Sequence, residues 1–295
     1  QCPPFHAQHC FQMLSFKAVR QAIRVVFLLV ACSLLTLSQG ALAAGKEGAA
    51  GVVAGDIVSA GRLRMQSQRL AKLYQQAGMG LNATQAMQQI TVSAGEIDSE
   101  FGRLGASVKK PNVRRVLTRC DALWQEMRAA LKQAPGPASA ERVNQLADEL
   151  MIHTGKLSML IEAEGETPVG RLIDLSSRLN MLSQRLARLY LLAQGGNLSQ
   201  GVVVDIEQAR KEFSTGLGEL DTARENSPAS RDAIGLAKNQ WIFFESAINR
   251  LSVADRGDGK AVQNVATSSE RIAQVLDLAS AQYARDYSEA TRPLR

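Results

Sequence analysis

The chain contains one phrase twice, RLRMQSQRLAKLY at Arg62–Tyr74 and RLNMLSQRLARLY at Arg178–Tyr190. The two copies lie 116 residues apart, and landmarks elsewhere in the sequence keep almost the same spacing. These landmarks are a proline pair, a tryptophan pair and a leucine pair: Pro111 and Pro228, Trp124 and Trp241, Leu104 and Leu220. An offset that is held across separate segments predicts two tandem copies of one unit of about 116 residues.

Each copy is predicted to consist of four helices. The first helix of the second copy carries a leucine stripe with spacings of three and four, which is the pattern of a helix that packs along one face: Leu172, Leu175, Leu179, Leu182, Leu186 and Leu189. Glycine and proline clusters separate the helical segments. The predicted helices cover residues 52–78, 82–107, 111–133 and 139–164, then 169–194, 199–225, 228–252 and 260–290. We therefore predict an all-α protein of two tandem antiparallel four-helix bundles.

The N-terminal region has the pattern of a secretory signal. Three basic residues precede the apolar run at 25–37, and GALAA at 40–44 ends with the small residues that signal peptidase prefers. We expect a signal peptide at 1–43 that is cleaved before Ala44, with residues 1–12 as an over-long gene call. The two predicted units are then 44–165 and 166–295. Retention of 25–45 as a membrane anchor, or lipidation at Cys32, stays open. All three alternatives place the rest of the chain in the periplasm or outside the cell.

Composition excludes several functional classes. Without the signal the chain keeps 31 basic and 28 acidic residues, so its net charge falls from +6 to +3 and nucleic-acid binding is not expected. His153 is then the only histidine, and we predict no metal site, no cofactor and no catalytic residues, because no nucleophile–base pair or phosphate loop is present. Cys120, Trp124 and Trp241 are interpreted as core residues, and His153 as a residue at the helix surface or the edge of the core.

Basic residues recur at equivalent places of the two phrases: Arg62, Arg69 and Lys72 correspond to Arg178, Arg185 and Arg188. For Lys72 and Arg188 we expect a solvated basic face. Arg64 differs, because Ser67, Gln68 and Ala71 extend its face of the helix with short or neutral side chains that suit close approach by another helix. A guanidinium that is partly shielded from water requires an anion as its partner. The planar arrangement of its N–H donors matches the oxygen atoms of an oxyanion.

Two stretches resemble known sensor domains. SAGRLRMQSQRL at 59–70 resembles the motif of NarX-like nitrate sensors, and SSRLNMLSQRLARLYLL at 176–192 is similar to PilJ-like N-terminal domains of type IV pilus chemotaxis transducers. The resemblance implies a periplasmic four-helix bundle that binds nitrate or nitrite between first helices. It also implies that Arg64 is the main anion contact, with Asn180 as its counterpart and Ser67 and Gln68 as neighbours.

Asn180 departs from the sensor pattern, since an amide donates hydrogen bonds but brings no charge. The sequence leaves open whether Arg64 pairs with Asn180 inside one chain or with a second Arg64 in a homodimer. No second membrane span or signalling module follows before Arg295, so the protein is expected to act through a membrane receptor or an envelope protein. The alternative function is a ligand-free helical interaction module that associates with a type IV pilus, a chemoreceptor or the envelope.

Overall fold

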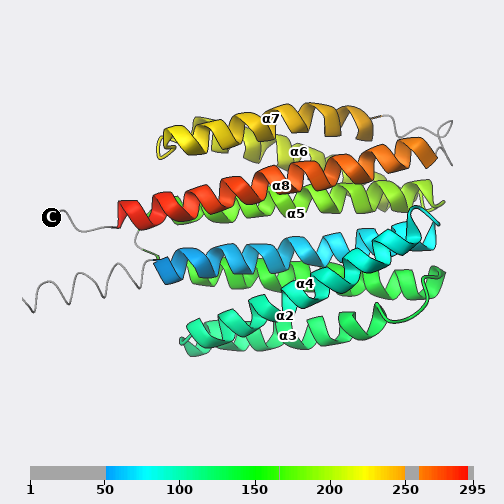
Figure 1. The fold of residues 1–295 in the computed structure, drawn as a ribbon, viewed down its shortest axis with the longest axis horizontal. Coiled ribbons are helices and arrows are strands. Elements are labelled where there is room, and N and C mark those ends of the chain that lie inside the picture. The colour runs from blue at the N-terminus through cyan, green and yellow to red at the C-terminus, as the bar shows by residue number, and fades with distance from the viewer. Residues whose placement is uncertain (1–50, 166, 250–258, 292–295) are drawn as a thin grey trace, which may run out of the picture. The chain divides into compact units, whose positions relative to one another are not determined.

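The computed structural model describes residues 51–165, 167–249 and 259–291, and all regular structure in these ranges is helical. A first helix at 51–78 is followed by seven more (Figure 1). Their bounds are α2 Ala83–Ser107, α3 Pro111–Ala130, α4 Pro137–Glu162, α5 Val169–Gln194, α6 Gln200–Thr222, α7 Pro228–Ile248 and α8 Gly259–Ala290. The predicted all-α class is confirmed.

Prolines and serines define where several helices begin. Pro111, Pro137 and Pro228 occupy the first turn of α3, α4 and α7, where a backbone N–H would have no partner inside the helix. At the start of α7 the Ser227 hydroxyl accepts a hydrogen bond from the Ser230 backbone nitrogen. The ends agree less well with the prediction, because α3 and α7 end at Ala130 and Ile248 rather than at 133 and 252.

The turns that follow the two repeated phrases depend on glycine. Gly80, after the first helix, has φ 73°, and Gly196, after α5, has φ 104°. Positive φ is open to glycine at little cost but is strained for most other residues. The two glycines are 116 residues apart, so the same turn closes the helix of each phrase.

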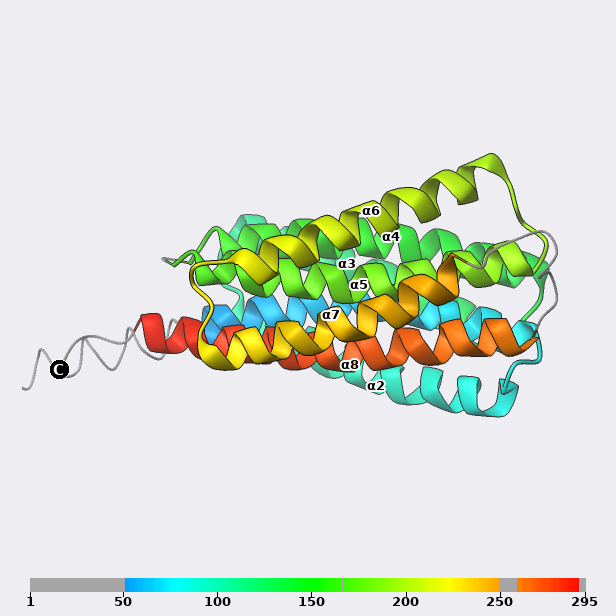
Figure 2. The ribbon, with the colours of Figure 1, turned by 90° about the horizontal axis from the view of Figure 1, so that it is seen from above.

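Helices α5 to α8 surround a shared apolar interior. α5 contacts α6 and α8, while α7 contacts α6 and α8 (Figure 2). The leucine stripe of α5 faces this interior, and only Leu175 among its six members is partly exposed. Trp241 stacks on Phe213 with ring centroids 4.1 Å apart, and Phe244 meets the Trp241 ring edge-on. The predicted packing role of Trp241 is confirmed.

The first helix forms hydrogen bonds with α2 and α4. Gln66 of the first helix donates a hydrogen bond to Glu96 of α2 (2.8 Å), and α3 contacts both α2 and α4. Trp124 is fully buried, with its indole N–H donating to Asp98 (2.8 Å). Cys120 is also fully buried, and this burial raises the pKa of its thiol to about 12. Trp124 and Cys120 are therefore core residues, as predicted.

The first helix and α5 lie side by side and run in the same direction. Gly61 contacts Ser177 so closely that a Cβ added to Gly61 would overlap the Ser177 side chain. Further along both helices, Lys72 donates a hydrogen bond to Gln184 (2.7 Å). Gly61 and Ser177 are 116 residues apart, so equivalent positions of the predicted repeat face each other within one chain.

The buried apolar side chains of both halves form a single cluster. The division into units 44–165 and 166–295 therefore stays a prediction. The proposed signal, its alternatives and residues 1–12 lie outside the described residues. Among the helices that are described, none is long and apolar enough to cross a membrane.

Candidate ligand-binding site

Nearly every basic side chain of the two phrases forms an ion pair with a carboxylate of a neighbouring helix. The pairs are Arg62 with Glu100 and Asp277, Arg69 and Lys72 with Glu270, Arg178 with Glu212, Arg185 with Asp205, and Arg188 with Asp148. Arg64 is the exception within the described ranges. Its Nε is buried without a hydrogen-bond partner, and its guanidinium forms no ion pair there.

The Arg64 guanidinium lies where the first helix, α4 and α5 meet. It passes over Gly155 of α4, where an added Cβ would come within 3.3 Å of the Arg64 Cζ and Nε atoms. Burial lowers the pKa of Arg64; the charge of Asp174 offsets part of this shift, while the charge of Arg178 adds to it. The site therefore contains a partly desolvated cation whose charge is not neutralised by a direct contact.

The other predicted site residues do not gather around Arg64. The Asn180 amide nitrogen donates to the Ala273 carbonyl of α8 (3.1 Å), and the Ser67 hydroxyl donates to the backbone oxygen of Arg64 (2.8 Å). Gln68 donates to the Ala147 carbonyl of α4 (3.1 Å). Arg64 thus contacts α4, whereas Asn180 contacts α8. The first helix and α5, which carry these two residues, are nevertheless neighbours.

Lys72 and Arg188 do not form a solvated face, and that prediction was wrong. Lys72 is fully buried and Arg188 is 2% exposed. The Lys72 ammonium donates to Ser269 (3.0 Å) and to Glu270 of α8, while Arg188 donates to Asp148 of α4 (2.6 Å). Each repeated phrase therefore sends one buried cation to the last helix of the other half.

Glu270 receives two cations from the first helix. Arg69 and Lys72 both contact its carboxylate. Burial alone would raise the pKa of Glu270, but the two cations outweigh burial and lower this pKa to about 2. The pKa of Lys72 is lowered, because full burial removes its ammonium from water more than Glu270 compensates.

This lowered pKa predicts a specific acid sensitivity. A carboxylate whose pKa is depressed by folding stabilises the fold above its unfolded pKa, which is 4.5 here, and loses that contribution as the pH falls toward about 2. We expect the free energy of unfolding to decrease between pH 4.5 and 2. Urea unfolding across this range should show a shallower decrease in Glu270→Gln. Equal slopes in both proteins would contradict the assignment.

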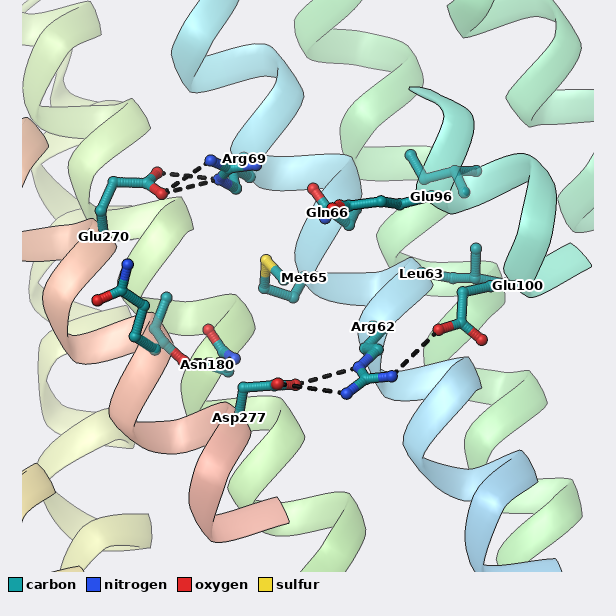
Figure 3. Close-up of a pocket in the computed structure, with 13 residues that line it drawn as sticks. Arg62, Leu63, Met65, Gln66, Arg69, Glu96, Glu100, Asn180, Glu270 and Asp277 are labelled. Carbon is teal, nitrogen blue, oxygen red and sulfur yellow. Dashed lines mark hydrogen bonds and ion pairs between the residues drawn. The ribbon is translucent and has the colours of Figure 1, made fainter. Parts of the chain in front are cut away.

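A cavity of about 410 Å³ opens beside this ion-pair network, between the first helix, α2 and α8 (Figure 3). Arg62, paired with Glu100 and Asp277, borders it at one end, and Arg69, paired with Glu270, borders it at the other. Of the four predicted site residues, Asn180 alone lines this cavity, while Arg64 lies elsewhere. Within the described ranges no group of histidine, cysteine or acidic residues is arranged to hold a metal.

Sequence reasoning missed Gly155, Asp148 and Glu270. A signal for two of them was present: aligning 157–161 with 272–276 sets Gly155 opposite Glu270. In this alignment α8 carries a carboxylate where α4 has no side chain. This exchange allows Arg64 to lie over α4.

Comparison with known proteins supports part of the expected resemblance. A family model described as the type IV pili methyl-accepting chemotaxis transducer N-terminal domain, PilJ, matches residues 47–149. Residues 47–149 resemble a PilJ domain. The match lies within the first of the two units for which this resemblance was predicted. The NarX likeness and the second copy stay predictions. No curated protein and no solved structure matches the chain.

Proposed function

We propose that this protein is the ligand-binding part of a chemoreceptor-type system and that Arg64 binds a small oxyanion, nitrate or nitrite first. The observation that carries the proposal is the state of Arg64. It is the one basic side chain of the two phrases that has no ion pair among the described residues, and its Nε is buried. A bound oxyanion would supply the missing charge and two parallel hydrogen-bond acceptors.

The pairing of the first helix with α5 inside one chain sets the expected stoichiometry. Asn180 occupies the position of the second phrase that corresponds to Arg64, and its amide donates to α8 instead. One chain therefore offers one charged anion contact. An exported protein of this kind would present its bound state to a membrane receptor or an envelope protein, since residues 47–149 resemble the sensory end of a transducer.

The proposal predicts selective stabilisation by anions. A ligand that binds only the folded state contributes about 2.7 kcal/mol at a hundredfold excess over its Kd, and this raises the midpoint of thermal unfolding by several degrees. We expect nitrate or nitrite to produce this rise at an ionic strength at which chloride and sulfate do not. The rise should vanish in Arg64→Ala.

A matched control keeps the result interpretable. Arg171→Ala also removes one positive charge, but it removes this charge from α5 and breaks a surface ion pair with Glu219, so the Arg64 site on the first helix stays intact. This variant should keep the selective rise. Equal stabilisation by all four anions, or a nitrate effect that survives in Arg64→Ala, would contradict oxyanion binding at Arg64.

One observation favours the second candidate, a ligand-free interaction module. Helix α7 exposes large apolar side chains, with Leu236 at 55%, Ile242 at 64% and Phe243 at 67%. If this module is the function, a photocrosslinking residue at position 243 should trap one defined protein in producing cells, whereas the same residue at Thr118, on the exposed face of α3, should not. The Arg64→Ala variant would leave this crosslink unchanged.

A further inference from the structure

The cavity beside the ion-pair network has a lining that is richer in carboxylates than in cations. Four carboxylates border it, from Glu96, Glu100, Glu270 and Asp277, and the two cations of the lining are Arg62 and Arg69. Both arginines are already bound to these carboxylates. The cavity is therefore unfavourable for an oxyanion. It is also separate from Arg64, which is not among the lining residues.

Two side chains that line this cavity each carry a buried amide oxygen without a hydrogen-bond donor. Gln66 and Asn180 are 8% and 4% exposed, and the Gln66 Oε1 and Asn180 Oδ1 atoms have no partner. The orientation of each amide is fixed by the hydrogen bond that its nitrogen donates. The Gln66 nitrogen donates to Glu96, and the Asn180 nitrogen donates to the Ala273 carbonyl, so neither amide can turn without losing a bond. A buried acceptor without a donor is costly, and a ligand with N–H groups would satisfy it.

Glu96, an exposed residue of the cavity lining, supplies the charge that such a ligand would need. Within the described part of the chain it forms no ion pair, and it receives only the hydrogen bond from Gln66 (2.8 Å). Figure 3 shows Glu96 and Gln66 on one wall of the cavity and Asn180 on the other, near Asp277. Acceptors thus border the cavity on opposite sides.

Apolar side chains cover the wall between these polar groups. Leu63 and Met65 of the first helix and Ile97 of α2 line the cavity. A volume of about 410 Å³ falls within the range of pockets that hold small organic ligands. The combination of an apolar wall and acceptors at both sides suits an alkyl chain with N–H donors at its ends.

We propose that this cavity binds a small aliphatic amine, with an ammonium group at Glu96 and Gln66 and a second N–H donor at Asn180. The site is separate from Arg64, so amine binding can be tested independently of oxyanion binding. Together with the oxyanion proposed at Arg64, the amine would give the protein two ligands of opposite charge.

The test is isothermal titration calorimetry of the full chain with 1,4-diaminobutane as the probe. 1,4-Butanediol has the same length without charge, and tetramethylammonium has charge without N–H donors. We expect saturable binding of the diamine at one site per chain, and at least tenfold weaker binding of both controls, because each lacks one of the two features of the site. Absence of diamine binding at millimolar concentration would overturn the proposal.

Two variants locate the site. Glu96→Gln keeps the size of the side chain and should weaken diamine binding about threefold to fivefold, because an ion pair at an exposed carboxylate contributes about 1 kcal/mol or less. Gln66→Met removes the free acceptor while keeping the chain length and should weaken diamine binding about tenfold. Glu126→Gln, a surface carboxylate paired with Arg142, should have no effect. Circular dichroism establishes that each variant folds. Equal diamine affinity in the parent protein and in both cavity variants would overturn the assignment, whereas nitrate stabilisation should persist in both.

Discussion

Replacement of Glu270 by Gln is expected to destabilise the fold by about 3 kcal/mol at pH 7. This is the lower end of the usual cost of removing one partner of a buried ion pair, because Lys72 is fully buried whereas the Glu270 side chain is 27% exposed. Lys72 would keep hydrogen bonds to Gln184 and Ser269, but its fully buried ammonium would lose its neutralising charge. Arg69 would lose its carboxylate partner as well. Urea unfolding monitored by circular dichroism measures this loss directly.

The Glu270→Gln loss should also depend on pH. A buried lysine without a counter-charge can escape the penalty by losing its proton. We therefore expect a smaller loss at pH 10 than at pH 7. Asp277→Asn is the control, because Asp277 lies on the same helix and pairs with Arg62 at a partly exposed site, where ion pairs contribute about 1 kcal/mol or less. A Glu270→Gln loss no larger than that of Asp277→Asn would contradict the structural role of Lys72.

Replacement of Gly61 by Leu is expected to cost about 3 kcal/mol, at the upper end of typical overpacking penalties. The Gly61 position lies against the Cβ and Oγ of Ser177, which sit close to the α5 backbone and cannot move aside as a long side chain would. The first helix and α5 would have to separate. For a domain of this size, the midpoint of thermal unfolding should fall by roughly 6–12 °C.

Two further variants separate this packing effect from a general effect of glycine replacement. Gly95 lies on α2 with open space around it, so Gly95→Ala should stabilise the protein slightly through helix propensity. Gly61→Ala should be destabilising, and adding Ser177→Gly should recover part of the loss because the two positions are in contact. If Gly61→Ala stabilises the protein as Gly95→Ala does, the close approach of the two helices is wrong.

The helices could be predicted because their signals are local. The leucine stripe from Leu172 to Leu189 defines α5, the prolines at 111 and 228 begin α3 and α7, and Gly80 and Gly196 close the repeated turns. Each of these signals depends on residues within a few positions of one another. The 116-residue offset also led to the correct set of eight helical segments within the described ranges.

The burial of Lys72 and Arg188 could not be predicted in the same way. A leucine stripe shows that one face of a helix is buried, but it does not show that a second group of helices covers the opposite face. The carboxylates that neutralise these cations, Glu270 and Asp148, lie 198 and 40 residues away from them in the sequence. Only the pairing of the first helix with α5 brings these groups together. Arg64, by contrast, has no direct ion pair within the described ranges, although the charges of Asp174 and Glu212 act on it.

Calorimetric titration of nitrate into the full chain decides whether Arg64 forms an anion site within one chain. We expect one nitrate per chain, bound by a protein that is monomeric in analytical ultracentrifugation. Binding should be undetectable in Arg64→Ala and weaker in Arg64→Lys, which keeps the charge but loses the planar guanidinium. One nitrate per two chains in a stable dimer, or unchanged affinity in Arg64→Ala, would contradict an intrachain site built on Arg64.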